Sequence, residues 1–587
     1  MFFRNKLIIT LFLCISLTLT VSCGTKSGSS VSGGDYSNFP FAVTNDDPPI
    51  KGGTLKVGIA ASDPLKGIFA AILYEDSKDS SVLGWFEENI VSFDSNFVAD
   101  QDGASTYTLD KDARSITLYM KEGVKWHDGA SVTLDDLVFA YEVICHPDYE
   151  GPRYNEDFKN VVGAAEYHEG KARAISGLEL SKDKMTLTIR FIEIKPTILV
   201  GGFWVAAAPR HYLGDIPVKD LLTSEKIRTK PIGFGPFKVK TVVSGEAVEF
   251  ERYDDYWRGR PLLDGVSLKV VNPDMVPQAM ESGELDVCDF SAQVYPDYLT
   301  PSNYQYIGQL ATAYTYTGFD LGDFDKEKRT NVSDPGKKMT NRDLRQAIGY
   351  AVNNAAIGED LYNGLRVPAT TIITPRHAGY QNSYIMGYYY DPEKAKQLLD
   401  AAGYTDMDGD GYREDLNGER LTIYWAMMDG PGAETIAQFK IQNWKDVGLR
   451  VQLFNGRLLE MNVFYNYVQY DEPGIDMFDG AWQTGFDPDP FGLWGDHDWN
   501  FPHATTPELM AAMTACSSEQ AWDDEFRANA YRKWQELFFE EAMAIPTLWR
   551  TEIVAVNNRV KNYDMSSSDI DMKLHLIELT ATAPYRK

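Results

Sequence analysis

The chain has 587 residues, which is too many for one hydrophobic core and predicts two or three domains. Its hydrophobic content of 44% is ample for packed cores and excludes general disorder. Lys and Arg number 56 against 85 Asp and Glu, and the net charge of −29 argues against a nucleic-acid partner, whose phosphates demand a basic surface.

The N-terminus is typical of an exported protein. Arg4 and Lys6 precede an apolar run over residues 7–21 that is too short to span a bilayer stably, so residues 1–22 are predicted to be a signal peptide. The run ends in Thr-Val-Ser-Cys, which resembles a lipobox, although leucine is preferred where Thr20 stands. The resemblance implies acylation of Cys23 and a lipid anchor on the outer face of the cytoplasmic membrane. The alternative is ordinary cleavage that frees the protein.

Residues 23–49 are rich in Gly, Ser, Asp and Pro, a composition that indicates a flexible tether rather than a folded segment. Three further cysteines follow in the mature chain, at Cys145, Cys288 and Cys516. They are widely spaced and form no metal-ligand pattern and no obvious disulfide framework, so we expect each to lie in a hydrophobic core.

Residues 107–149 combine a strand, a turn and a helix. Apolar residues alternate over 115–120, which predicts a half-buried strand, and Thr133 with Asp136 is the start of a capped amphipathic helix. Between them, His127 and Asp128 have the types of a general base and its orienting carboxylate. No glycine elbow presents a nearby serine, so we interpret them as residues that shape the turn.

Further along the chain, strands and helices are predicted to alternate. Residues 391–404 give a helix, because Asp391 is a suitable cap, Pro392 suits the first turn and Gly403 suits the end. Strands are predicted over 421–425 and 449–453, with a helix over 434–447 between them. This alternation indicates an α/β fold in which helices cover sheets.

Several motifs occur in an order that closely resembles the family 5 extracellular solute-binding proteins, the oligopeptide, dipeptide and nickel receptors of bacterial ABC importers. Phe234 and Tyr253 depart from the residues usual in that family. The region after residue 62 is similar in particular to the Gram-positive oligopeptide-binding branch. Besides residues 107–149, the matching segments are KGGTLKVG (51–58), PIGFGPFKVK (231–240), RYDDYWRGRPLLDGVSLKVV (252–271), MESGELDV (280–287) and NRDLRQAIGYAVN (341–353).

The resemblance implies a two-lobed, periplasmic-binding-protein-like α/β fold with an extra subdomain inserted in the first lobe. Transferred to this chain, it places the first lobe at 50–90, 228–318 and 552–587. The inserted subdomain is then 91–227 and the second lobe 319–551. The ligand is expected between the two lobes.

The family places a strand-like ledge at residues 480–495, and we expect Ala481, Trp482 and Gln483 to hold the ligand backbone. Receptors for short peptides carry an aspartate on this ledge that pairs with the ligand's amino terminus, and Gly485 stands at that position here. We therefore expect longer peptides to be accepted. The predicted cavity-lining residues are Phe486, Trp494, Trp549 and the loop containing Asp63, Leu65 and Phe69. The alternative for each aromatic residue is a place in the core.

Residues 406–412 have the carboxylate spacing of the first half of a calcium-binding EF-hand loop, from Asp406, Asp408 and Asp410 with Tyr412 offering its carbonyl. The glutamate expected at the last position is replaced by asparagine, so Asp415 or Glu414 would complete the shell. This pattern predicts a structural Ca²⁺ site; the alternative is an empty, solvated acidic turn. No other cofactor is expected.

The resemblance implies a monomeric receptor that captures oligopeptides and delivers them to the permease and ATPase subunits of an ABC importer. Within the same scaffold, an oligosaccharide or a metal chelate is the alternative ligand. A peptide sensor or adhesin would use the same binding chemistry. A secreted hydrolase is disfavoured because no motif positions a nucleophile or a carboxylate pair, and the chain is not expected to be an enzyme.

Overall fold

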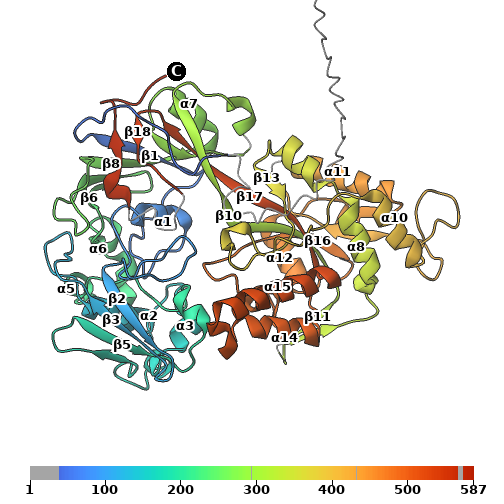
Figure 1. The fold of residues 1–587 in the computed structure, drawn as a ribbon, viewed down its shortest axis with the longest axis horizontal. Helices are drawn as coiled ribbons and strands as arrows, with labels where there is room; N and C mark the ends of the chain where they lie inside the picture. The colour runs from blue at the N-terminus through green and yellow to red at the C-terminus, as the bar shows by residue number, and fades with distance from the viewer. Residues whose placement is uncertain (1–38, 293, 329, 431, 566–572) are drawn as a thin grey trace, which may run out of the picture.

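The computed structural model describes residues 39–292, 294–328, 330–430, 432–565 and 573–587. The predicted signal peptide and the predicted lipidation site Cys23 lie outside these residues. The described chain forms two lobes that lie side by side and are joined by long strands (Figure 1). No helix in the described part is long and apolar enough to cross a membrane.

One large sheet is shared by the two lobes. Its strands in chain order are β1 (Thr54–Ala60), β6 (Phe237–Val243), β7 (Ala247–Arg252), β8 (Gly265–Val271), β9 (Val287–Asp289), β10 (Tyr304–Phe319), β13 (Arg366–Pro368), β14 (Ile423–Ala426), β15 (Val451–Leu453), β16 (Met477–Gln483) and β17 (Ala544–Asn557). Their order in space is β15-β14-β16-β10-β17-β9-β1-β8-β7-β6, with β13 paired to β17 off this path. Parallel and antiparallel pairs are mixed, as in many large α/β sheets.

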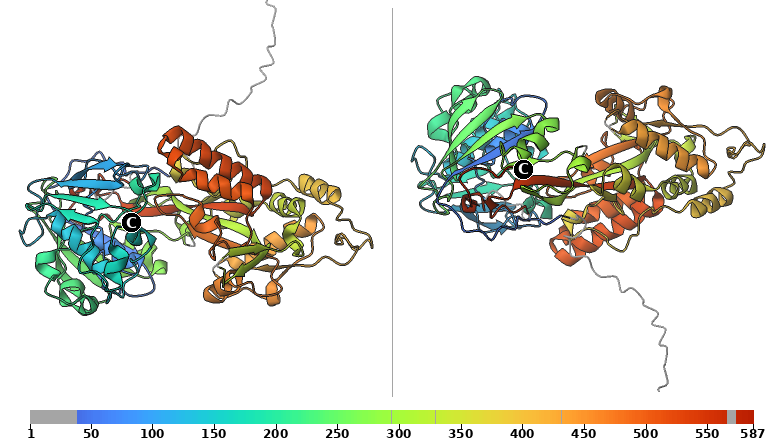
Figure 2. Two further views of the ribbon diagram at one scale, coloured as in Figure 1. Left: turned by 90° about the horizontal axis from the view of Figure 1, so that it is seen from below. Right: turned by 90° about the horizontal axis from the view of Figure 1, so that it is seen from above.

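The strands β10 and β17 connect the lobes. In the first lobe, residues 304–310 of β10 pair with residues 551–557 of β17, and β9 extends the sheet beside β17. In the second lobe, the pairing resumes between Tyr314 and Trp549, and β16 extends the sheet beside β10. The register shifts between Leu310 and Tyr314, so the ladder is interrupted where the strands pass from one lobe to the other. Figure 2 shows long strands running between the two lobes.

A four-stranded sheet forms the inserted subdomain at the lower left of Figure 1, in the order β2-β3-β5-β4. Two further sheets have two strands each. The bounds are β2 (Ser105–Asp110), β3 (Ser115–Met120), β4 (Leu178–Leu180) and β5 (Thr186–Arg190) for the insert, with pairs β11 (Gly322–Asp325) and β12 (Thr330–Ser333), and β18 (Val560–Lys561) and β19 (Glu578–Leu579).

The helices confirm the predictions made from capping and periodicity. Thr133 and Asp136 form a capping box on α2, Asp391 caps α10 by accepting a hydrogen bond from the Lys394 N–H, and Gly403 follows α10 with φ at 91°. The bounds are α1 (Ser77–Leu83), α2 (Leu134–Ile144), α3 (Glu156–Lys159), α4 (Ala164–His168), α5 (Arg210–Leu213), α6 (Glu225–Arg228), α7 (Val276–Glu281), α8 (Arg342–Ala351), α9 (Asn354–Ala356), α10 (Pro392–Ala401), α11 (Ala433–Asp446), α12 (Met461–Gln469), α13 (Phe491–Trp494), α14 (Pro507–Cys516) and α15 (Asp524–Glu541).

The residues His127 and Asp128 have structural roles in the described fold. The His127 ring accepts a hydrogen bond from the Gly233 N–H at Nδ1 and donates from Nε2 to the Gly235 carbonyl. Asp128 accepts from the Ala130 N–H within the turn. These bonds fasten the insert to the segment 233–235, which confirms the interpretation of this pair as turn residues.

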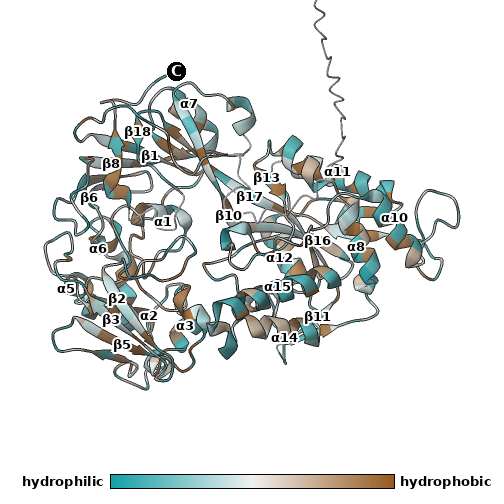
Figure 3. Cartoon of the chain, in the orientation of Figure 1, coloured by the Kyte–Doolittle hydropathy of each residue, from teal (hydrophilic) through white to brown (hydrophobic). Residues whose placement is uncertain are grey.

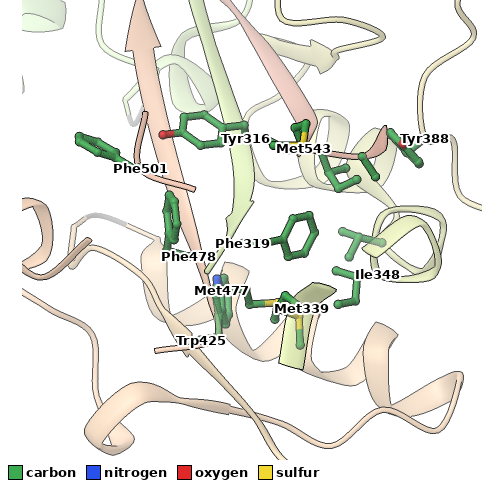
Figure 4. Close-up of a cluster of buried hydrophobic side chains, with 14 of the residues drawn as sticks. Tyr316, Phe319, Met339, Ile348, Tyr388, Trp425, Met477, Phe478, Phe501 and Met543 are labelled. Atoms are coloured by element: carbon green, nitrogen blue, oxygen red, sulfur yellow. The ribbon is translucent and has the colours of Figure 1, made fainter. Parts of the chain in front are cut away.

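In the described chain the second lobe and the insert have one hydrophobic core each, and the first lobe has two. The second-lobe core packs the strands β10, β14 and β16 under the surrounding helices, with side chains such as Phe319, Ile348 and Trp425 (Figure 4). Outside it, α15 is largely hydrophilic toward solvent (Figure 3). The insert core also takes in the segment 68–73, which the predicted domain limits assign to the first lobe. The three described cysteines are buried and unpaired, as predicted.

Candidate ligand-binding cleft

The strand-like ledge predicted over residues 480–495 is strand only as far as Gln483, where β16 ends, and residues 491–494 form the helix α13 instead. The N-terminal half of β16 is fixed in the second lobe. The carboxylate of Asp479 accepts hydrogen bonds from the Thr317 hydroxyl at 2.7 Å and from the Trp425 indole N–H at 3.3 Å. It also pairs with the ammonium group of Lys440, which is buried. These three contacts come from β10, β14 and α11, so the ledge is held on a rigid base.

The second half of β16 has one open edge. On one side β10 pairs with it as far as Gln483, whereas on the other side β14 ends at Ala426, opposite Phe478. Backbone groups alternate in direction along an antiparallel strand. The Thr484 N–H donates to β10, at the Thr312 carbonyl. By this alternation the N–H and C=O groups of Ala481 point to the open edge, together with those of Gln483.

Next to the ledge, Gly485 faces the sequence segment 375–377. Its carbonyl accepts a hydrogen bond from Nε2 of His377 at 3.1 Å. Burial lowers the pKa of His377 to about 4, and the positive charge of Arg376 acts in the same direction. His377 is therefore neutral at physiological pH. A Cβ atom built on Gly485 meets no heavy atom within 4 Å, so the space that an aspartate would need is open.

The residue after Gly485 reaches across to the insert. The Phe486 ring stacks on Phe97, with centroids 4.9 Å apart and planes at 11°, and lies 5.3 Å from the Phe93 ring. The guanidinium of Arg376 lies 5.2 Å from the centroid of Phe97. We call Phe93, Phe97 and Phe486 the cross-cleft aromatic cluster, because the first two belong to the insert and the third to the second lobe.

Two cavities have walls from both the insert and the second lobe. The first has a volume of about 370 Å³, and Phe486 contributes to its wall. Its other lining residues come from the first lobe and the insert, namely Ala71, Tyr74, Ser80, Leu83, Gly84, Glu87, Glu88, Asn89, Phe93, Gly201, Phe203, Trp204, Val205 and Ala206. The second, of about 580 Å³, lies between insert residues such as Asn160 and second-lobe residues such as Phe491.

The other predicted lining residues are mostly buried. Trp494 and Trp549 lie in the second-lobe core, where their indole N–H groups donate to the Tyr314 hydroxyl and the Thr371 carbonyl. These core positions do not favour the prediction that Trp494 and Trp549 contact the ligand, because each indole N–H already has a partner within the protein.

In the predicted loop of the first lobe, Leu65 and Phe69 pack in the hydrophobic core, whereas Asp63 is exposed. By contrast, Trp482 is half-buried on the ledge, against Phe501. Gln483 is exposed beside it. Only the ledge residues and Phe486 are thus both accessible and close to the contact between the lobes.

The two aspartates after the ledge have partners of their own. Asp487 accepts a hydrogen bond from the buried guanidinium of Arg527 and another from the Tyr531 hydroxyl, both at 2.9 Å. Asp489 accepts from the Phe491 N–H, and its pKa is raised by burial and by the charge of Asp487. Both carboxylates fix the loop, so neither replaces the missing anchor at Gly485.

The acidic loop brings together three of its carboxylates. Oxygen atoms of Asp406, Asp408 and Glu414 lie within 4.8 Å of one another. Asp410, which was predicted as a ligand, instead pairs with Arg450 at 2.5 Å. Asp415, also predicted, accepts the N–H groups of its own turn at residues 417 and 419. The arrangement suits a hard cation through three carboxylates, with Glu414 rather than Asp415 in the set.

Sequence reasoning missed several residues at the cleft. Glu87, Phe93, Phe97, Arg376 and His377 belong to no recognised motif. The adjacent pair of glutamates in WFEEN, between apolar residues, was the only signal that a charged group is buried there.

Comparison with known proteins gives concordant results. A sequence profile of the bacterial extracellular solute-binding proteins, family 5 (middle), matches residues 101–500. The oligopeptide-binding protein OppA of Lactococcus lactis subsp. cremoris is 32% identical over 585 residues, which cover 97% of this chain and 97% of that relative.

Among solved structures, lactococcal OppA complexed with an endogenous peptide in the closed conformation has a TM-score of 0.71 and 31% identity, over 90% of this chain and 100% of that one. AppA from Bacillus subtilis in complex with a nonapeptide has a TM-score of 0.63 at 21% identity, over 91% and 100% of the two chains, and this likeness concerns the fold alone. The chain belongs to the family 5 bacterial extracellular solute-binding proteins.

Proposed function

We propose that this protein is the oligopeptide-binding component of an ABC importer. As a member of an extracellular solute-binding family, it is exported and binds a solute rather than catalysing a reaction. The observation that carries the peptide assignment is the open edge of β16 at Ala481 and Gln483. An extended peptide that adds to such an edge is held through its backbone, so its side chains can vary. The full-length likeness to relatives named as oligopeptide-binding proteins supports the same ligand class.

Capture is proposed to proceed by closure of the two lobes. The strands β10 and β17 are continuous between the lobes, and their ladder is interrupted after Leu310, which gives a natural place to bend. The cross-cleft aromatic cluster closes the opposite side. A peptide that contacts both lobes favours the closed arrangement over the open one, and this difference in affinity is the driving force.

The finer parts of the assignment are also proposals. The lobe limits are proposed to follow the predicted segments, except that β10 passes into the second lobe where its ladder is interrupted, between Leu310 and Tyr314, rather than at residue 318. Cys23 is proposed to carry the lipid anchor that keeps the receptor at the membrane, near the permease and ATPase subunits to which it delivers peptide. The receptor is proposed to act as a monomer.

Mass spectrometry of the ligands released by denaturing the purified protein tests the function. A mixture of peptides of varied sequence is the expected result, and it also gives their length range. A single oligosaccharide or metal chelate would replace the peptide assignment by the alternative ligand. As a second test, two peptides of equal composition and scrambled order, without Lys or Arg, are titrated into the protein, and we expect affinities within about tenfold, since backbone hydrogen bonds ignore sequence. Trp482→Ala should weaken both equally.

Calcium is proposed as a structural cofactor of the acidic loop. Asp406, Asp408 and Glu414 would hold it, and the ion would supply only stability, since the loop belongs to the second lobe away from the cross-cleft contact. The positive φ angles of Gly409 and Gly411 permit the tight turn that brings the carboxylates together.

A further inference from the structure

The carboxylate of Glu87 is half-buried and has few partners within the protein. It lines the cavity of about 370 Å³ that Phe486 also borders. Among the described residues, its hydrogen-bond partner is the Ala71 N–H at 3.2 Å, and it forms no ion pair. Burial raises the pKa of Glu87 to about 8. A carboxylate that is half-buried beside aromatic rings, with no ion-pair partner in the described chain, is less favourable than one in water, so its position needs an explanation.

The neighbouring carboxylate, Glu88, lines the same cavity and has a structural role. Glu88 accepts hydrogen bonds from the Tyr256 hydroxyl at 2.9 Å, from the Trp257 indole N–H at 3.0 Å and from Arg258 at 2.9 Å. Both of its oxygen atoms are thus used, and one faces a cation. Glu87 borders the same cavity without such a set, which leaves it available to a partner from outside the protein.

The walls of the cavity define the kind of partner that fits. Aromatic rings come from Phe93, Phe203, Trp204 and Phe486, alongside alanine, leucine and valine side chains; the polar part of the wall is Tyr74, Ser80, Asn89 and the two glutamates. The volume far exceeds the roughly 30 Å³ that one water takes in the liquid. Apolar and aromatic walls suit a long methylene chain, and their rings attract a cation by its charge. Because the carboxyl group of Glu87 has no ion-pair partner among the described residues, the charged end of the ligand side chain is expected to be a cation.

We propose that this cavity is a subsite for the cationic side chain of a lysine or arginine in the bound peptide, with Glu87 as its ion-pair partner. The proposal rests on the proposed function, and it adds a side-chain preference at one ligand position to a receptor that otherwise holds the backbone. The ledge supports this placement, because Phe486 borders the cavity only three residues after Gln483 ends β16.

Proton release accompanies binding at this subsite. The charged groups around Glu87 have other partners: Arg153 donates to the carbonyls of Ala71 and Tyr74, Lys226 to the Tyr212 carbonyl, and Arg258 to Glu88. With a pKa near 8, Glu87 is largely protonated at pH 7 in the empty protein. A ligand ammonium or guanidinium group ionises it, and the displaced proton passes to the buffer.

The test uses alanine-rich nonapeptides, the ligand length in the Bacillus subtilis structure. One lysine is moved through every position and compared with norleucine, which keeps the methylene chain without the charge. At one position we expect the lysine peptide to bind roughly 10- to 100-fold more tightly, as for a hydrogen bond to a charged group. The preference should be larger at pH 9 than at pH 6, on either side of the pKa of about 8.

Glu87→Gln keeps the shape and the acceptor for the Ala71 N–H, so the norleucine peptide should bind it as before while the lysine preference disappears. Glu75→Gln, which changes an exposed carboxylate, is the matched control and should keep the preference. Calorimetry in buffers of different ionisation enthalpy should detect proton release with the lysine peptide and none in Glu87→Gln.

A lysine preference absent at every position, or unchanged in Glu87→Gln, would overturn the subsite while leaving peptide binding intact. Failure of all the peptides to bind would overturn the proposed function together with the subsite.

Discussion

Phe486→Ala should weaken the closed arrangement of the lobes. The substitution removes two ring contacts across the cleft, at 4.9 Å to Phe97 and 5.3 Å to Phe93. Aromatic pairs contribute about 0.5–1.5 kcal/mol each, so the loss is about 1–3 kcal/mol. Because peptide binds the closed state, this loss passes into the apparent affinity, which should fall by roughly 5- to 150-fold.

Small-angle scattering of the empty protein separates closure from direct ligand contact, since Phe486 also borders the Glu87 cavity. We expect a larger radius of gyration for Phe486→Ala, and calorimetric titration with peptide should show the reduced affinity. Tyr390→Ala removes an aromatic side chain of equal exposure, 42% in both cases, from a surface away from the cluster, and should change neither quantity. An unchanged radius together with an affinity within twofold of the native value would refute the reasoning.

Four further predictions concern the site and its support. Gly485→Asp should tighten binding of short peptides that have a free amino terminus, and not of their acetylated forms, in calorimetric titrations; equal effects on both would contradict it, since the new charge pairs only with an ammonium group. Arg559→Met leaves the buried Asp286 without its two hydrogen bonds at 2.6 and 2.7 Å, and should lower the free energy of unfolding in denaturant by about 3–5 kcal/mol; a loss below 1 kcal/mol would show that the pair is not needed. Calcium should raise the melting temperature by about 1–5 °C, and Glu414→Gln should abolish the rise; a temperature indifferent to calcium and chelator counts against the site. The pKa of His377 is about 4 in the folded protein and 6.5 in the unfolded chain, so the stability that comes from its neutral form is present above pH 6.5 and is lost as the pH falls toward 4. Over this pH range the free energy of unfolding of His377→Gln, measured in denaturant titrations, should therefore fall by about 3 kcal/mol less than that of the native protein. Parallel pH curves for the two proteins would contradict this.

Features with local signals could be predicted from the sequence. The helix α2 was predicted from the capping box at Thr133 and Asp136, and α10 from Asp391, Pro392 and Gly403. In each case the residues that decide the helix end lie within one turn of it, so no tertiary information is needed. The position of the ledge came instead from family resemblance, because its single open edge depends on where a distant strand ends.

Features that depend on distant contacts could not be predicted. Asp410 has the right spacing for calcium, but the fold brings Arg450 to it and uses its charge. Trp549 and Phe486 were both predicted to line the cavity. Only tertiary packing decides that Trp549 lies in the core and that Phe486 stacks on Phe97 of the insert. Glu87 could be proposed as a ligand-binding residue only from the residues that surround it in the folded chain.

The position of β17 in the shared sheet has a consequence for how the protein is made. This strand lies between β9 and β10, and the last residues of the chain return to the same region, where the Tyr585 carbonyl accepts hydrogen bonds from Asn303 and Asn557. Synthesis and export proceed from the N-terminus, so neither lobe can complete its sheet until β17 has crossed the membrane. The insert, whose core draws mainly on residues 68–234, can pack much earlier. The binding cleft therefore forms after the insert, once β17 has reached the compartment in which the protein meets its ligand.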